Sequence, residues 1–433
     1  MSKRLKLDRS LSLWKEARRL IPNGTQSLSK GPTQFSFGVS PIYAVSGKGA
    51  EIFDVDGNAY IDSGMGLHAV ILGYADPDVT KAIFKSVQSG IHFTLMHPLE
   101  VEVAALFSKK IPCAEQVRFT KTGSEATAAS VKIARAVTGR SHIATCGYHG
   151  WHDWFLGVSE KTLGIARAVT ELVHKFHYND IQSLERIFND YPGQIAAVIM
   201  EPCLVDVPRD DFLNKCREIA KSHESLFIFD ETITGVRWDA SGAQSLFNVI
   251  PDLAIFGKSI ANGMPLAAIV GKKKYMEILD DPRFFFSSTF AGEFASLAAC
   301  KATYAVIDRR HVIPKIWERG RTFITRFNDL IHDHKLSDFL EITGFPCRPT
   351  VIFKKKDGIE PLAIKSYMQQ ESAQRGLLFT GYFALSFSHD EDIIDRSLII
   401  VDNVLKKLKT VLSKGELATS LRGEIVSAVF RSL

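Results

Sequence analysis

The 433-residue sequence lacks the cysteine pattern of a disulfide-stabilised secreted protein. Its six cysteines are spread along the chain without a CxxC pair, at positions 113, 146, 203, 216, 300 and 347. This spacing is typical of free thiols in a reducing compartment. The first twenty residues are basic and lack the apolar run of a secretory signal. We therefore expect a cytoplasmic protein.

Long apolar runs and a strong excess of either charge are also missing. No stretch of 18 or more apolar residues occurs, so the sequence predicts no membrane-spanning helix. The net charge is +5, from 53 basic and 48 acidic residues. This excess is small for the chain length, and the lysine runs at 272–274 and 354–356 carry no interleaved aromatic residues. Nucleic acid is therefore not an expected partner.

The middle of the chain alternates between two kinds of segment. Strand-like apolar segments cover residues 116–120, 142–146, 194–201, 225–230, 252–257 and 265–271. Helix-like segments cover residues 124–139 and 211–223. Strands that alternate with helices, and apolar runs that are continuous, favour a parallel sheet covered on both faces. The sequence predicts an α/β fold with a mostly parallel, doubly wound sheet.

The two chain ends have a different pattern. Residues 50–63 predict a β-hairpin that turns at Asp56-Gly57-Asn58. We expect a large domain at 61–305 and a smaller α+β domain built from 1–60 and 306–433. The last segment, 415–433, has the pattern of an extra amphipathic helix.

Three residues lie at the carboxyl ends of predicted strands, where parallel sheets bind ligands. They are Glu201, Asp230 and Lys258. Taken alone, Lys258 fits a strand-end lysine that reaches water as well as an amine in covalent chemistry. The turn at Gly123 and Ser124 places helix amides where an anion binds, although, taken alone, a plain turn with a serine cap is the better explanation.

Together these features match the requirements of pyridoxal phosphate (PLP). A lysine amine condenses with the cofactor aldehyde, a carboxylate keeps the pyridine nitrogen protonated, a helix N-terminus holds the phosphate, and an aromatic ring stacks on the pyridine. Asp230 and Lys258, the Gly123–Ser124 turn and the aromatic segment 147–155 supply these groups in one chain.

Six segments resemble the class III PLP-dependent aminotransferases, and within them the glutamate-1-semialdehyde 2,1-aminomutase-like branch. They are TGSEATAASVKIARAVTGR, GYHGWHDW, MEP, FIFDETITGVR, PDLAIFGKSIANGMPLAAIVG and SSTFAGEFASLAA, in family order. Weaker similarity extends from about residue 14 to residue 410. The resemblance implies the PLP-transferase type I fold and a cofactor that alternates between PLP and pyridoxamine phosphate.

The resemblance also implies roles for individual residues. Lys258 forms the Schiff base and moves the proton, and Asp230 pairs with the pyridinium nitrogen. Gly123 and Ser124 bind the phosphate, and Tyr148 stacks on the ring.

Four further positions are implied to lie at the cofactor. His149 and Glu201 lie beside it, and Thr232 stands where the family usually has a valine that packs on the ring. Thr289 matches a threonine that reaches the phosphate in a neighbouring subunit, so the resemblance implies a homodimer. His149, His152 and Asp153 have loose spacing, and we expect no metal site there.

The segments around Lys30, His68 and His97 match those that line the family's substrate pocket. Lys30 falls where the aminomutases have an arginine for the substrate carboxylate, and lysine lacks the bidentate fork of arginine. This departure favours transfer of an amino group from an amino acid to a carbonyl acceptor, for example a keto or aldehydo sugar or polyol. Two alternatives are an aminomutase, which is an isomerase, and a catalytically silent protein with this fold.

Overall fold

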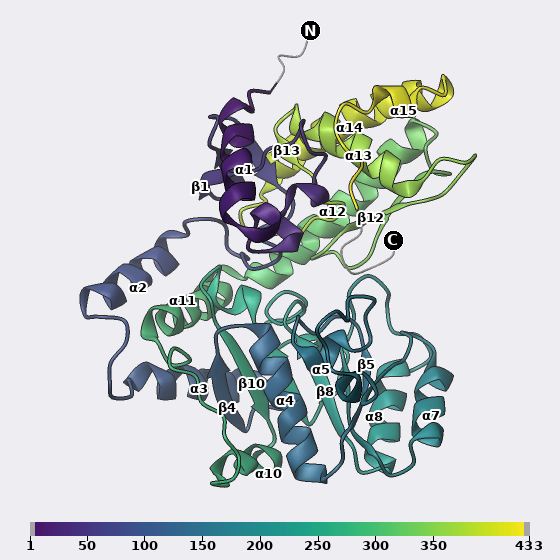
Figure 1. Cartoon of the computed structure of the whole chain (residues 1–433). Helices are drawn as coiled ribbons and strands as arrows, with labels where there is room; N and C mark the ends of the chain where they lie inside the picture. The colour runs from purple at the N-terminus through teal and green to yellow at the C-terminus, as the bar shows by residue number, and fades with distance from the viewer. Residues whose placement is uncertain (1–4, 428–433) are drawn as a thin grey trace. The chain divides into compact units, whose positions relative to one another are not determined.

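The computed structural model describes residues 5–427, which form two compact units (Figure 1). The central unit contains residues 68–70 and 77–313. The end unit contains the described residues up to 67, residues 71–76 and those from 314 onwards. A smaller part built from both chain ends is therefore confirmed. The exact domain boundaries at 60/61 and 305/306 stay a prediction.

The core of the central unit is a seven-stranded sheet in the order β4-β10-β9-β8-β7-β5-β6. Its strands are β4 (Gln116–Thr120), β5 (His142–Cys146), β6 (Val173–Lys175), β7 (Ile195–Met200), β8 (Leu226–Glu231), β9 (Leu253–Phe256) and β10 (Ala267–Gly271). Only β10 runs antiparallel to its neighbours among these strands, and the other pairings are parallel. The mostly parallel sheet is confirmed.

Helix α4 (Gly123–Thr138) packs across this sheet and contacts β4, β10, β9, β8 and β7 (Figure 1). Its buried positions include Ala126, Ala129 and Ile133, spaced at helical intervals along one face. Helix α8 (Phe212–Ser222) contacts β7 and β8, and α7 (Ile181–Asp190) contacts α8. Every residue of β7, β8 and β9 is buried, which explains their continuous apolar runs.

Three longer helices complete the central unit. Helix α11 (Phe294–Arg310) packs on α2 (Pro77–Gln88) and α3 (Pro98–Lys110). The shorter helical elements are α5 (Asp153–Leu156), α6 (Arg167–Thr170), α9 (Ala243–Leu246), η4 (Lys258–Ala261), α10 (Lys273–Met276) and η5 (Glu277–Asp280).

The end unit contains two small sheets. One has the order β1-β2-β3-β13, and β2 and β3 form the predicted antiparallel hairpin. The Asp54 carboxylate accepts hydrogen bonds from the backbone amides of Asp56 and Asn58, which fixes the turn. The strands are β1 (Ala44–Lys48), β2 (Glu51–Asp54), β3 (Ala59–Asp62), β11 (Leu340–Thr343), β12 (Thr350–Phe353) and β13 (Leu377–Leu378). The helices are α1 (Asp8–Leu20), η1 (Pro22–Gly24), η2 (Leu28–Lys30), η3 (Pro32–Gln34), α13 (Pro361–Ala373) and α14 (Glu391–Ser413), and α12 (Val312–Asp333) begins in the central unit.

The C-terminal segment differs from the expected helix. A single turn, α15 (Leu417–Ser420), is followed by extended chain. The amides of Glu424 and Ser427 donate to the carbonyls of Phe37 and Thr33, so backbone pairing replaces the helix. Residues 428–433 of the predicted helix lie outside the described residues.

Two further observations concern residues 5–427. None of their helices has the length and apolar content needed to cross a bilayer. The six cysteines are all buried free thiols.

Candidate active site

A cavity of about 280 Å³ opens at the carboxyl ends of the parallel strands of the central unit. We call it the strand-end cavity. The turn after β4, the loop after β5 and the ends of β7, β8 and β9 all contribute to its lining. Eight residues predicted at the cofactor line it together: Gly123, Ser124, Tyr148, His149, Glu201, Asp230, Thr232 and Lys258. Side chains that are far apart in sequence therefore face one small volume.

Lys258 enters this cavity from the end of β9. Its backbone has φ of +48°, in the left-handed region that costs a residue with a side chain roughly 1–2 kcal/mol. Gly257 before it is also closely packed, because a Cβ there would lie 3.2 Å from Thr232 Cγ2. Backbone strain of this kind is concentrated at functional sites. The geometry favours an amine presented to the cavity over a lysine that merely reaches water past a strand.

Asp230 is the last but one residue of β8 and is 3% exposed. Its Oδ2 lies 2.8 Å from His149 Nδ1, and its Oδ1 accepts the backbone amide of Thr232 at 3.0 Å. Burial alone raises the pKa of Asp230, but the hydrogen bond and electrostatic effect of His149 and the backbone hydrogen bond from Thr232 outweigh burial. The pKa lies below its ordinary 3.8, so this buried carboxyl group stays anionic.

The turn before α4 is arranged around helix amides. Thr122 caps the helix, since its hydroxyl accepts the Glu125 amide at 3.2 Å and the Glu125 carboxylate accepts the Thr122 amide at 3.0 Å. The cap is Thr122 and not Ser124, so the Ser124 side chain lines the cavity instead. Gly123 and Ser124 are the first residues of α4, where free helix amides favour an anion. Their binding of the phosphate stays a prediction.

Two features of this turn fit a bound phosphate ester. A Cβ on Gly123 would lie 3.1 Å from Thr232 Oγ1, so the glycine permits close approach. Thr232 Oγ1 is buried and has no hydrogen-bond partner among the described residues. A buried hydroxyl without a partner is unfavourable unless a ligand satisfies it. The residues present therefore fit a polar group at this position.

Tyr148 and Glu201 are linked through the backbone. Glu201 Oε2 accepts the Tyr148 amide at 3.0 Å, and a Cβ on Gly147 would lie 2.6 Å from the same oxygen. Glu201 thereby fixes the loop that carries the Tyr148 ring. The Tyr148 ring meets the Phe155 ring edge-on at 5.5 Å.

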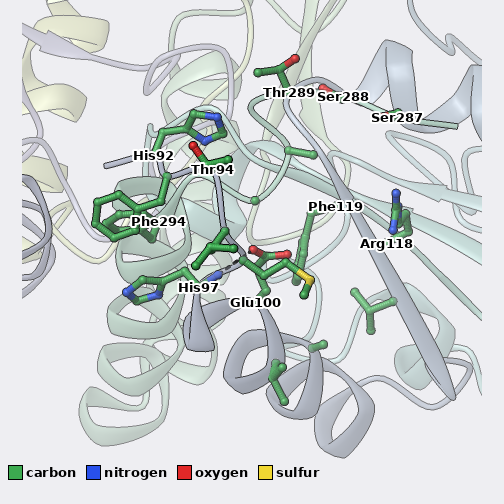
Figure 2. Close-up of a pocket in the computed structure, with 18 residues that line it drawn as sticks. His92, Thr94, His97, Glu100, Arg118, Phe119, Ser287, Ser288, Thr289 and Phe294 are labelled. Carbon is green, nitrogen blue, oxygen red and sulfur yellow. Dashed lines mark hydrogen bonds between the residues drawn. The ribbon is translucent and has the colours of Figure 1, made fainter. Parts of the chain in front are cut away.

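Thr289 and His97 line a second cavity of about 710 Å³ in the central unit, which we call the side cavity (Figure 2). His97 caps α3, because its Nδ1 accepts the Leu99 amide at 3.1 Å, and its ring stacks on Phe294 at 4.2 Å. These contacts give His97 a structural role. Its assignment to substrate binding stays a prediction.

The other two predicted substrate residues are placed differently. His68 is buried with φ of +72°, and its carbonyl oxygen accepts the Ser259 hydroxyl at 2.6 Å. Lys30 is exposed and ends the short helix Leu28–Lys30 of the end unit. Their substrate roles stay predictions.

Sequence reasoning missed Lys121, which also lines the strand-end cavity. Its Nζ donates to Glu293 Oε1 at 2.8 Å and to the Pro265 carbonyl at 3.2 Å. Lys121 directly precedes the Thr122 cap, and this position could have indicated from the sequence that it lines the cavity. Within the described residues, no group of three or more His, Cys, Asp or Glu side chains is arranged to hold a metal ion.

Comparison with known proteins decides the family. The model for aminotransferase class III matches residues 36–344. The chain belongs to the class III aminotransferases.

Individual members show how far the similarity extends. The 3-aminobutyryl-CoA aminotransferase of Cloacimonas acidaminovorans is 36% identical, with 82% of this chain and 86% of that protein covered. The glutamate-1-semialdehyde 2,1-aminomutase of Aquifex aeolicus is 31% identical over 92% of this chain and 99% of that protein. An omega-transaminase structure from Sphaerobacter thermophilus has a TM-score of 0.82 at 26% identity, covering 92% and 97% of the two chains.

The family assignment establishes what kind of enzyme this is. The chain is a PLP-dependent enzyme of the transaminase and aminomutase group, with the type I fold predicted from its motifs. PLP and its amine form are the cofactors typical of this class. The strand-end cavity, with its buried anionic Asp230 and the unpaired hydroxyl of Thr232, fits that cofactor.

Proposed function

We propose that the enzyme transfers an amino group from an amino acid donor to a separate carbonyl acceptor. The observation that carries the proposal is the convergence of Lys258, anionic Asp230 and the α4 N-terminus on one cavity of about 280 Å³. Bound PLP supplies an electron sink for negative charge at the carbon that bears the amino group. The roles below belong to the side chains of this chain.

Lys258 holds the cofactor through its Nζ and, once released, takes the proton from the α-carbon of the donor. Asp230 holds the pyridine nitrogen in its protonated form, because its own pKa is low. Gly123 and Ser124 bind the phosphate through backbone amides at the positive end of α4. Tyr148 covers one face of the ring and excludes water.

The lining of the strand-end cavity supports a polar acceptor whose recognition does not depend on an arginine that binds a carboxylate through two hydrogen bonds. Among the described residues that line it there is no arginine, and its aliphatic amines are Lys121 and Lys258. We propose a keto or aldehydo group on a sugar, polyol or similar polar molecule. The name of the relative from Cloacimonas, a 3-aminobutyryl-CoA aminotransferase, suggests a second acceptor class, a 3-oxoacyl thioester.

The second candidate function is an intramolecular amino shift. The aminomutase from Aquifex aeolicus supports it, because similarity extends over 99% of that protein. Purified enzyme mixed with glutamate separates the two functions. A transaminase loses the visible band of its PLP form and releases 2-oxoglutarate in one equivalent, whereas a strict mutase does neither with the donor alone.

We further propose that the chain works as a homodimer in which Thr289 serves the neighbouring subunit. The surface around the side cavity supports this. Leu95, Met96, Val101 and Phe285 are 82%, 88%, 73% and 77% exposed, and all but Phe285 line the cavity beside Thr289. Large apolar side chains gathered on one exposed surface are typical of an interface. A second copy of the chain is the occupant we propose.

A further inference from the structure

The segment from Phe284 to Phe290 leads into α11 and carries Thr289 (Figure 2). Residues 284–288 have neither helix nor strand structure, and Phe285 is 77% exposed. Fixing such a chain costs backbone entropy of roughly 1–2 kcal/mol per residue. A threonine that must place its hydroxyl against a ligand therefore needs other contacts to hold its segment.

Two cationic side chains supply those contacts. Lys132 Nζ donates to the Phe285 carbonyl at 2.6 Å, and the amine lies 4.7 Å from the centre of the Phe284 ring. Arg118 Nη2 donates to the Phe286 carbonyl at 3.2 Å, and its guanidinium lies 5.5 Å from the Phe286 ring centre. Each cation thus makes one charge-assisted hydrogen bond and one ring contact, and together the two cations contact the consecutive residues 284–286.

These cations come from the elements that flank the proposed phosphate turn. Arg118 lies on β4, Lys132 lies on α4, and the Gly123–Ser124 turn lies between them. Just beyond the segment, Glu293 is attached to the turn between β4 and α4, because Lys121 pairs with it at 2.8 Å. Glu293 in turn caps α11 by accepting the amides of Ala295 and Ser296.

We propose that Arg118 and Lys132 are positioning residues that hold Thr289 for the cofactor phosphate of a second copy of the chain. This inference rests on the proposed homodimer. Its distinctive consequence is that the two cations of one subunit act on the cofactor site of the other. If the two cations merely stabilised their own subunit, replacing them would weaken PLP binding in that subunit at least as much as in the other.

Mixed dimers separate these effects. Two differently tagged chains are co-expressed, and dimers with both tags are purified. One chain carries Lys258→Ala, so only its partner can be linked to PLP by borohydride reduction. In the trans arrangement, Arg118→Met and Lys132→Met are placed on the Lys258→Ala chain. In the cis arrangement they are placed on the chain that retains Lys258.

The readout is the amount of PLP fixed to Lys258 as a function of PLP concentration. In the trans arrangement we expect the half-saturating concentration to rise about tenfold, the effect of losing one well-placed hydrogen bond. In the cis arrangement it should stay near that of a dimer with Lys258→Ala alone. Arg118→Lys and Lys132→Arg keep a hydrogen-bond donor. Placed in the trans arrangement, they should return the half-saturating PLP concentration to the value of a dimer with Lys258→Ala alone.

Each other result overturns the inference in a recognisable way. Equal weakening in both arrangements, or weakening in cis alone, assigns the cations a structural role within their own subunit. No change in either arrangement means that they do not position Thr289. A monomeric wild-type chain that still binds PLP removes the dimer and this inference together, while the transaminase proposal stands. Absence of fixed PLP in the unaltered chain contradicts the transaminase proposal itself.

The matched control is Lys301→Met, which removes an exposed ion pair with Glu102. It should leave the half-saturating PLP concentration unchanged in both arrangements.

Discussion

The His149 ring bridges two acceptors, since its Nδ1 lies 2.8 Å from Asp230 Oδ2 and its Nε2 lies 3.2 Å from the Cys146 carbonyl oxygen. A carbonyl oxygen and a carboxylate oxygen both accept hydrogen bonds, so the ring is held between two acceptors. It lies directly against the carboxylate that we assign to the pyridine nitrogen, and its hydrogen bond and electrostatic effect lower the pKa of Asp230 despite burial. This pair keeps a fully buried acid ionised.

Replacement of His149 by leucine tests this relationship through pH. In the native protein the pKa of Asp230 is below 3.8, so protonation of Asp230 should not lower PLP affinity as pH falls from 8 to 5. Without His149 burial dominates and raises the pKa of Asp230. The carboxyl group then gains a proton as pH falls, and PLP affinity should decrease over that range. If the pH profile of PLP affinity in the variant, measured by absorbance titration, parallels the native profile, the assignment is contradicted.

Asp230→Asn tests the carboxylate itself. Loss of a charge-assisted hydrogen bond, worth about 1.5–3 kcal/mol, should lower the rate of the amino-donor half-reaction by roughly 10- to 150-fold. The matched control is Asp252→Asn, which removes a carboxylate near the start of β9 that binds Lys272 and the Phe227 amide. Stopped-flow absorbance with glutamate should find the control rate within about twofold of the native rate. Equal losses in the two variants argue for a general effect on folding.

Gly150→Ala tests the phosphate turn. Gly150 has φ of +101°, and a Cβ there would lie 2.3 Å from Ser124 Oγ. The substitution should displace Ser124 and weaken PLP binding about tenfold or more, while the affinity for pyridoxal, which lacks the phosphate, should fall less.

Gly193→Ala is the matched control, because Gly193 also has a positive φ of +70° and a Cβ there would meet no atom within 4 Å. Backbone strain of about 1 kcal/mol should affect both variants in thermal unfolding. Only the first should change the ratio of PLP to pyridoxal affinity.

A charged pair at the side cavity tests the dimer. Leu95→Asp combined with Met96→Asp places two carboxylates on the most exposed apolar surface beside Thr289. We expect sedimentation velocity to give a dimer for the native chain and a monomer for the variant. Ile399→Asp, at a site on α14 that is 62% exposed, should remain dimeric. A dimer that survives the double substitution places the interface elsewhere.

Much of the central sheet could be predicted from the sequence. Strands β7, β8 and β9 are buried at every position, so their apolar runs mark them to within two residues. Strand β6 was missed, since it has three residues and only Val173 is buried. A short edge strand carries too little apolar pattern to be recognised.

The site was predictable in its residues and less so in its contacts. Asp230 lies at the carboxyl end of β8 and Lys258 lies two residues after β9, so topology alone brings them to one edge of the sheet. The bond between His149 and Asp230 joins residues 81 positions apart, and no spacing rule specifies it. Thr122 and Ser124 both carry a hydroxyl group that can cap the N-terminus of α4, and the local sequence pattern does not show which of them does so. The structure assigns the cap to Thr122.

Reduction with borohydride, followed by peptide mass spectrometry, tests the central claim most directly. PLP is added to the purified protein, the complex is reduced, and the digested chain is searched for the added phosphopyridoxyl group. The account predicts that the group is attached to the Lys258 amine in stoichiometric amount, and that Lys258→Ala abolishes the attachment. A label on another lysine, or an unlabelled chain, would contradict it.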